Sequence, residues 1–301
     1  MRILCSVDGS EFSQWAVEAV GALDRSSIDS VTLVHVKDTH RLVAVGSPRA
    51  VSYRGLSAAL EKAGAEILKK ARRQATVVLS ESPRKPHTKI KTLMRTGSPA
   101  SGILESAAQE RASLIVMGTR GLSDGKGFLL GSVSRKVASM APCPVLVVKR
   151  PMTKAARVLL AVDGSKYSDA AARFLRSGLL QESATVTICT SAETPVTDLA
   201  SRYLSDRQLE DLKRPVLERA NAVVTAVREQ FISEGYTVTT EVRLNHVIDS
   251  ILTLAAEEGS DLLVVGSRGL SRQDRLYLGS VSEALLKYAP CSILIVRGVR
   301  G

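Results

Sequence analysis

Two glycine-rich segments hold the residues best suited to bind a ligand. Each follows an apolar run and has the pattern Gly-x2-Gly-x9-Gly-Ser, from Gly118 to Ser132 in the first half of the chain and from Gly266 to Ser280 in the second. Glycines directly after a strand let the backbone approach a ligand, because no Cβ stands in the way. The closing Gly-Ser predicts a helix start, whose amides and dipole suit a phosphate group. Each segment therefore predicts a phosphate-binding loop.

The spacing differs from that of two well-known phosphate loops. The P-loop requires Gly-Lys-Ser/Thr, and the dinucleotide fingerprint requires Gly-x-Gly-x-x-Gly; neither occurs here. For a single Gly-x-x-Gly, a simple strand-to-helix turn would be the better interpretation. Two complete copies in one chain favour a binding site.

An aspartate ends the first apolar run of each half, at Asp8 and at Asp163. A carboxylate near phosphates could hold Mg²⁺ or orient a water molecule. It could equally accept backbone N–H bonds in a turn, and the sequence leaves both roles open. Because neither half offers a recognisable general base or a phosphate-binding lysine of the P-loop kind, we expect ligand positioning rather than hydrolysis.

The chain repeats itself. Val7-Asp8-Gly9-Ser10 recurs 155 residues later, and three further motifs recur at one common offset of 148 residues. These three begin at Met117, Gly131 and Ala141. Chance does not keep one spacing across three motifs, so we predict two domains, residues 1–150 and 155–301, joined by a short linker.

In each half, short β-branched runs alternate with longer stretches of helical period, which predicts βαβ units and a parallel sheet. The strands read as nearly continuous apolar runs, which is typical of buried parallel strands. Predicted strands of the first half are Ile3–Val7, Val31–Val36, Thr88–Met94, Leu114–Met117 and Val145–Val148, and its helices are Ser13–Leu23, Leu56–Leu79, Pro99–Gln109 and Ser132–Ser139. Predicted strands of the second half are Arg157–Val162, Thr185–Cys189, Thr237–Val242, Leu262–Val265 and Ile293–Val296.

Composition excludes several classes of protein. An aspartate at position 8 comes too early for a secretory signal, no segment has the length of a membrane span, and four scattered cysteines suit neither a disulfide framework nor zinc. We therefore expect a cytoplasmic protein. The net charge of +11 lies in the first half, where residues 1–150 hold 23 basic and 12 acidic side chains against 18 of each in residues 151–301. One interpretation is an electrostatic patch for an acidic partner or nucleic acid. Because no aromatic residues interleave with these charges, a solvated helix face without a nucleic-acid partner is the favoured interpretation.

The two Gly-x2-Gly-x9-Gly-Ser segments resemble the ATP-binding branch of the universal stress protein family, and the resemblance covers residues 2–297 as a tandem of two family domains. It implies an α/β fold with two doubly wound domains, each a five-stranded parallel sheet in the order 3-2-1-4-5 flanked by helices. It also implies that the nucleotide lies between strands 1 and 4, at the topological switch point.

The resemblance also assigns binding residues. In the first half these are Ser6, Val7 and Asp8 after strand 1, Val36 beside the adenine, Met117, Gly118, Arg120 and Gly121 facing the ribose and phosphates, and Gly131, Ser132, Val133 and Ser134 holding the phosphate tail. In the second half they are Ala161, Val162, Asp163, Val265, Gly266, Arg268, Gly269, Gly279, Ser280, Val281 and Ser282. The second half departs from the pattern at Ser191, a polar residue where Val36 stands in the first half, and at Asn245, which aligns with Gly97.

From this resemblance we expect a stress-response regulator that binds ATP, with or without Mg²⁺, and presents its nucleotide state to an unidentified protein partner. One alternative is an enzyme that hydrolyses ATP slowly or phosphorylates itself on Ser132 or Ser134; another is a scaffold that binds no ATP, or a binder of a different adenine nucleotide. The family also implies that the last strands, Val145–Val148 and Ile293–Val296, pair antiparallel as an internal pseudo-dimer. A homodimer of whole chains is a further alternative.

Overall fold

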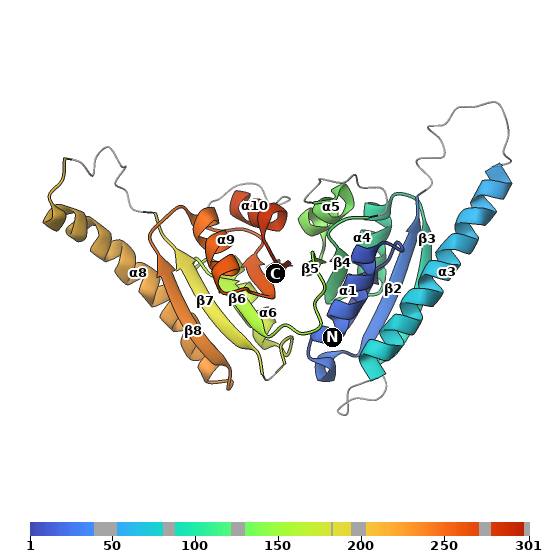
Figure 1. Ribbon diagram of the computed structural model, residues 1–301, viewed down its shortest axis with the longest axis horizontal. Coiled ribbons are helices and arrows are strands. Elements are labelled where there is room, and N and C mark those ends of the chain that lie inside the picture. Colours follow the sequence, from blue (N-terminus) through green and yellow to red (C-terminus); the bar gives the residue numbers. More distant parts are fainter. Residues whose placement is uncertain are drawn as a thin grey trace. The chain divides into compact units, whose positions relative to one another are not determined.

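The computed structural model describes residues 1–38, 53–80, 88–121, 130–181, 183–193, 203–270 and 278–297 (Figure 1). The chain divides into two compact units, Met1–Lys154 and Ala155–Gly301. Each unit has the doubly wound α/β fold that the sequence predicts, and each is described here by itself.

The first unit is built on five parallel strands. They are β1 (Arg2–Ser6), β2 (Ser30–Lys37), β3 (Lys89–Thr96), β4 (Leu114–Gly118) and β5 (Val145–Val148), and they lie in the order β3-β2-β1-β4-β5. Helices α1 (Glu11–Ala22) and α3 (Tyr53–Ser80) pack together, as do α4 (Pro99–Gln109) and α5 (Ser132–Met140), so that the sheet is covered on both faces. A short 3₁₀ turn, Arg25–Ser27, which the sequence did not predict, follows α1.

The second unit repeats this order. Its strands are β6 (Arg157–Ala161), β7 (Thr185–Ser191), β8 (Thr237–Arg243), β9 (Leu262–Gly266) and β10 (Ser292–Val296), and they lie in the order β8-β7-β6-β9-β10. Helices α6 (Lys166–Arg176) and α8 (Asp206–Ile232) form one layer, and α9 (Val247–Glu257) and α10 (Ser280–Tyr288) form the other.

The central strands form the core of each unit. Every residue of β4, β5, β9 and β10 is buried. The prediction of nearly continuous burial is wrong for β3 and β8, in which no residue is fully buried because polar side chains occupy most of their positions. Among the described residues, no helix combines the length and apolar content that crossing a membrane requires.

Candidate functional site

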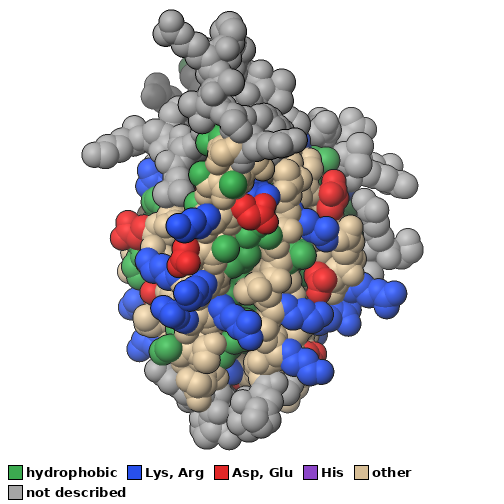
Figure 2. All heavy atoms as spheres, turned by 90° about the vertical axis from the view of Figure 1, so that its right-hand side faces the viewer, with side chains coloured by type: hydrophobic (Ala, Val, Ile, Leu, Met, Phe, Trp, Pro, Cys, Tyr) green, Lys and Arg blue, Asp and Glu red, His purple; other side chains and the backbone are tan. Residues whose placement is uncertain are grey.

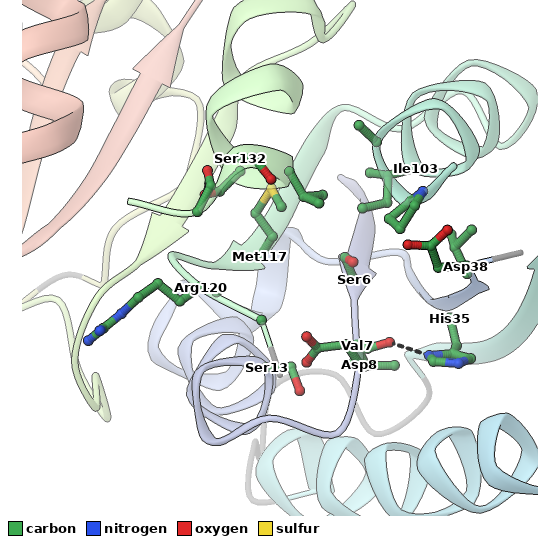
Figure 3. Close-up of a pocket in the computed structure, with 18 of the residues that line it drawn as sticks. Ser6, Val7, Asp8, Ser13, His35, Asp38, Ile103, Met117, Arg120 and Ser132 are labelled. Carbon is green, nitrogen blue, oxygen red and sulfur yellow. Dashed lines mark hydrogen bonds between the residues drawn. The ribbon is translucent and has the colours of Figure 1, made fainter. Parts of the chain in front are cut away.

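A cavity of about 710 Å³ lies in the first unit where β1, β2 and β4 end (Figure 3). The first turns of α4 and α5 close two of its sides, and α3 lines a third. All twelve residues that the sequence assigned to the first half line this one cavity: Ser6, Val7, Asp8, Val36, Met117, Gly118, Arg120, Gly121, Gly131, Ser132, Val133 and Ser134.

Further residues line the cavity that the sequence did not single out. His35 precedes Val36 on β2, Asp38 follows the last residue of that strand, Ile103 comes from α4, and Lys136 comes from the second turn of α5. The closeness of His35 and Asp38 to Val36 in the sequence could have indicated both, since residues at a strand end reach the same edge of the sheet. Nothing in the sequence indicated the α3 residues of the wall, because only tertiary packing brings that helix to the site.

The β1–α1 turn places Asp8 at the rim of the cavity. Gly9 has a positive φ of 87°, and Asp8 Oδ1 accepts hydrogen bonds from the Ser10 backbone N–H (2.9 Å) and hydroxyl (2.6 Å). The Ser10 side chain in turn caps α1 by accepting from the Ser13 N–H. The turn role predicted for this aspartate is therefore present, and its position in the cavity wall keeps a ligand role open.

The same turn recurs in the second unit. Gly164 has a φ of 75°, Asp163 Oδ1 accepts from the Ser165 N–H (2.9 Å), and Ser165 caps α6. Because both copies use the aspartate in the same way, the Val-Asp-Gly-Ser motif has a structural reason that does not depend on a ligand.

The first glycine of each loop is required by packing. A Cβ on Gly118 would lie 2.6 Å from Phe12 Cβ and 2.7 Å from the Phe12 carbonyl carbon, in the first turn of α1. A Cβ on Gly266 would lie 2.7 Å from the carbonyl carbon of Tyr167, the equivalent residue of α6. At these two positions the architectural interpretation of the glycines holds, because a helix backbone cannot give way as a side chain can.

The arginine of each loop stacks on an aromatic residue at the equivalent position of the first helix of its unit. The Arg120 guanidinium lies 4.6 Å from the Phe12 ring centroid. Arg268 lies 5.5 Å from the Tyr167 ring, and its Nη1 donates to the Tyr167 hydroxyl (3.1 Å). Arg120 lines the cavity, but its side chain extends away from Ser6 and Met117 (Figure 3). The arginines thus fasten the glycine loops to the first helices.

The α5 start is shaped for an anion. Gly131 is the N-cap of α5 without a side-chain capping bond, so the amides of the first turn have no acceptor within the helix. Ser132 is exposed, whereas Ser134 is buried and its hydroxyl donates to Thr119 O (2.7 Å) and Gly131 O (2.9 Å). Ser132 is therefore the available hydroxyl, and Ser134 can serve a ligand only through its backbone.

His35 ties the end of β2 to the end of β1. Its Nδ1 is 2.8 Å from the Val7 carbonyl oxygen and must donate, because a carbonyl only accepts.

On β1, burial raises the pKa of the Cys5 thiol to about 12, and burial does the same for Cys189 on β7. Both cysteines are therefore neutral packing residues.

In the second unit the predicted residues occupy the equivalent elements. Two observations there concern Gly269 and Ser191. A Cβ on Gly269 would lie 2.7 Å from Asp163 Oδ2, and the Ser191 hydroxyl donates to the Asn245 carbonyl oxygen (2.9 Å). The structure places Ala161, Val162 and Asp163 at the end of β6, Val265, Gly266, Arg268 and Gly269 at the end of β9, and Gly279, Ser280, Val281 and Ser282 at the start of α10.

A family model, related sequences and a solved structure all point to one protein family. The model of the Universal stress protein family matches residues 1–149 and again residues 155–297. A universal stress protein of Methanocaldococcus jannaschii is 36% identical over 150 residues, which cover 50% of this chain and 82% of that protein. The universal stress protein YxiE of Bacillus subtilis is 30% identical over 154 residues, covering 49% and 98%. The crystal structure of a universal stress protein from Archaeoglobus fulgidus shares the fold over 98% of both chains, with a TM-score of 0.68 and 21% identity.

Proposed function

This chain belongs to the universal stress protein family, in the form with two family domains in one polypeptide, and from that we propose that it is a stress-response regulator that binds ATP. Each domain offers one site between its first and fourth strands, and the cavity of the first domain is the principal one. A protein partner of unidentified chemistry reads the nucleotide state.

The observation that carries this proposal is the single cavity lined by all twelve motif residues. Its volume of about 710 Å³ lies within the range of roughly 300–1,000 Å³ that is typical of small-molecule sites. It lies where β1 and β4 are neighbours and the crossovers change direction, which is where ligands bind in open α/β sheets. One wall is apolar and another holds an uncapped helix start, as a nucleotide requires.

The wall residues divide between the two ends of a nucleotide. Val36, Met117 and Ile103 are apolar side chains suited to the base. Ser132, the amides of the first α5 turn and Lys136 are suited to phosphates. The site thus matches an amphipathic ligand with one anionic end.

A Mg²⁺ ion carried by the phosphates fits this wall. The Asp8 carboxylate and the Ser132 hydroxyl line the same cavity and supply the oxygen ligands that Mg²⁺ prefers. Among the described residues, no group of three His, Cys, Asp or Glu side chains is arranged to hold a metal by itself. Bound Mg²⁺ would neutralise phosphate charge, while the chain's own part is to position the phosphates.

The two serines considered for self-phosphorylation differ in how available their hydroxyls are. Self-phosphorylation on Ser134 is disfavoured, because that hydroxyl is buried and already donates to two carbonyl oxygens. Ser132 is the remaining acceptor of the two serines considered. Slow ATP hydrolysis and a scaffold without ATP stay alternatives, and pairing of the last strands and location in the cytoplasm stay predictions.

The first test counts the nucleotide that the protein carries. The full chain is purified without added nucleotide and denatured, and released adenine nucleotides are identified and counted by chromatography and mass spectrometry. We expect ATP at one or two molecules per chain, where one indicates an inactive second domain. No released nucleotide, together with no binding on titration, would favour the scaffold instead.

A pair of matched variants then assigns the sites. Ser132→Asp places a carboxylate in the first turn of α5, where it favours the helix dipole but repels phosphate, so the fold is kept while ATP affinity falls roughly tenfold or more. Ser280→Asp makes the same change in α10. Calorimetric titration of ATP should show loss of the stronger site in the first variant only, and unchanged titration in both would contradict the assignment.

A further inference from the structure

The solvent side of α3 is strongly basic. Lys62, Lys69, Lys70, Arg72 and Arg73 are all exposed on this helix. Lys69 has Glu66 at 4.0 Å, and among the described residues no carboxylate lies within ion-pair distance of the other four. Figure 2 faces the edge of the first unit that α3 and β3 form, and there Lys and Arg side chains are more frequent than Asp and Glu.

The equivalent helix of the second unit is neutral. Residues 53–80 and 89–96, which form α3 and β3, contain nine Lys or Arg and two Glu, a net charge of +7. Residues 206–232 and 237–243, which form α8 and β8, contain six Lys or Arg and six Asp or Glu, a net charge of zero. Because both pairs of elements have the same place in the same fold, neither the fold nor protection of an edge strand requires the charge of α3.

The basic side chains of α3 also lie close together along the helix. Lys69 has like charges three and four residues later at Arg72 and Arg73, and Lys70 has one three residues later. Like charges at these spacings cost about 0.2–0.5 kcal/mol per pair, and Glu66, at favourable spacings from Lys69 and Lys70, offsets that cost. In α8, by contrast, Lys and Arg are matched in number by Asp and Glu, and Asp211 and Arg214 form an ion pair at 3.0 Å. The four cations from Lys69 to Arg73 thus share one carboxylate, which leaves positive charge for a partner to neutralise.

We propose that the basic side of α3 binds the phosphate backbone of duplex nucleic acid, without reading its sequence. Along the helix, Lys62 to Arg73 span about 16 Å at ~1.5 Å per residue, so a small anion would meet only part of the row. A duplex carries a charge about every 1.7 Å of its axis and meets the whole row at once. Exposed Lys89 of the edge strand β3 extends the positive charge beyond the helix, whereas Lys91 is ion-paired with Glu110 at 3.4 Å.

The uncharged residues of this surface favour that partner. Apart from Tyr53 at the start of α3, residues 53–80 and 89–96 contain no aromatic side chain, so the row from Lys62 to Arg73 has no aromatic platform on which single-stranded bases could stack. The large exposed apolar side chains of α3 are Leu56 and Val77, too few to insert into a membrane or to form an apolar protein interface. The sequence alone favoured a solvated face. The placement of the basic side chains on one helix, and the lack of net charge on the equivalent helix of the second unit, change that expectation.

The test compares two variants of equal net charge. The first carries Lys69→Gln, Lys70→Gln, Arg72→Gln and Arg73→Gln, and the control carries Lys213→Gln, Arg214→Gln, Arg219→Gln and Arg228→Gln on α8, all at exposed helical positions. Both lower the formal net charge from +11 to +7. Binding to a fluorescent duplex of about 30 base pairs is measured by anisotropy between about 50 and 200 mM salt.

We expect the wild-type chain and the α8 variant to bind alike, with affinity falling steeply with salt. Each phosphate contact contributes a slope of about −0.9 in log K against log salt, so losing four contacts should reduce the slope by about 3–4 and the low-salt affinity by roughly tenfold or more. ATP binding should be the same in all three proteins, which separates this surface from the nucleotide site.

Three results would overturn the proposal. The first is no binding of the duplex by the wild-type chain up to about 100 µM, the weak end of sequence-independent affinities. The second is an equal loss of duplex affinity in the two variants, which would mean that binding depends on net charge alone. The third is binding to phosphatidylserine vesicles through α3 without binding to the duplex. The last would identify a membrane surface as the partner.

Discussion

The glycine loops of the two domains are held by the same contacts. In each, the first glycine lies against the backbone of the first helix, at Phe12 or at Tyr167. The next arginine stacks on that aromatic ring, and a buried serine, Ser134 or Ser282, donates its hydroxyl to a carbonyl of the strand-4 end. Since the repeats have diverged at most positions, these shared contacts identify what the fold needs in order to hold the loop.

The side chains that face the cavity are where the two domains differ. Val36 of the first domain corresponds to Ser191, whose hydroxyl is bonded to the Asn245 carbonyl oxygen, and Lys136 corresponds to Ala284. The second domain therefore lacks one apolar neighbour for the base and one cation for the phosphates. The contacts of the motif therefore belong to the scaffold, and we propose that nucleotide occupancy depends on residues outside the motif.

The largest expected effect tests the shared scaffold. Gly118→Ala and Gly266→Ala each bring a Cβ within 2.6–2.9 Å of helix atoms, largely backbone, so each should lower the free energy of unfolding of its own domain by about 3 kcal/mol. Urea denaturation followed by circular dichroism measures this. Gly55→Ala on α3, where a Cβ meets nothing within 4 Å, should be neutral or slightly stabilising.

This prediction also affects how the site is tested. Alanine at Gly118 or Gly266 would disturb the domain as well as the ligand, so a loss of ATP binding in these variants could not be assigned to the site. If both variants instead unfold at the wild-type denaturant concentration, the glycines do not serve packing, and the scaffold half of the comparison fails.

Much of the fold and of the candidate site could be predicted from the sequence. The tandem form follows from the repeated motifs and the strand order from the family resemblance, and the twelve residues that the resemblance assigned to the first half all lie around one cavity. The direction of Arg120 could not be predicted, because stacking on Phe12 joins residues more than a hundred positions apart. The half-exposed β3 and β8 were predicted as buried strands although polar side chains occupy most of their positions.

A smaller effect should sharpen the difference between the two proposed sites. Lys136→Ala removes the cation that lines the first cavity near Ser132 and should weaken ATP binding there by about 3–10-fold, corresponding to roughly 1 kcal/mol for a partly exposed charge. Ala284→Lys adds the cation to the second domain and should strengthen its site by a similar factor. Titration calorimetry at low and high salt measures both.

The salt dependence is the control for this exchange. An electrostatic contribution from Lys136 should shrink at high salt, because exposed charges are screened. If Lys136→Ala weakens binding equally at both salt concentrations, its effect comes from packing, and the charge difference between the domains does not explain their affinities.

The smallest expected effect concerns the arginines, which the family resemblance places facing the ribose and phosphates. A double-mutant cycle of Arg120→Met and Phe12→Leu should give a coupling of about 0.5–1 kcal/mol in unfolding free energy, the usual size for a cation over an exposed aromatic ring. The cycle of Arg268→Met and Tyr167→Phe should also give a stabilising coupling in unfolding free energy, because Arg268 donates to the Tyr167 hydroxyl. Since the guanidinium of Arg120 lies on Phe12, Arg120→Met should change ATP affinity less than Lys136→Ala does. A larger loss of affinity with no coupling to Phe12 would mean that Arg120 turns to the phosphates when ATP binds, and the arginines would then belong to ligand recognition rather than to the shared scaffold.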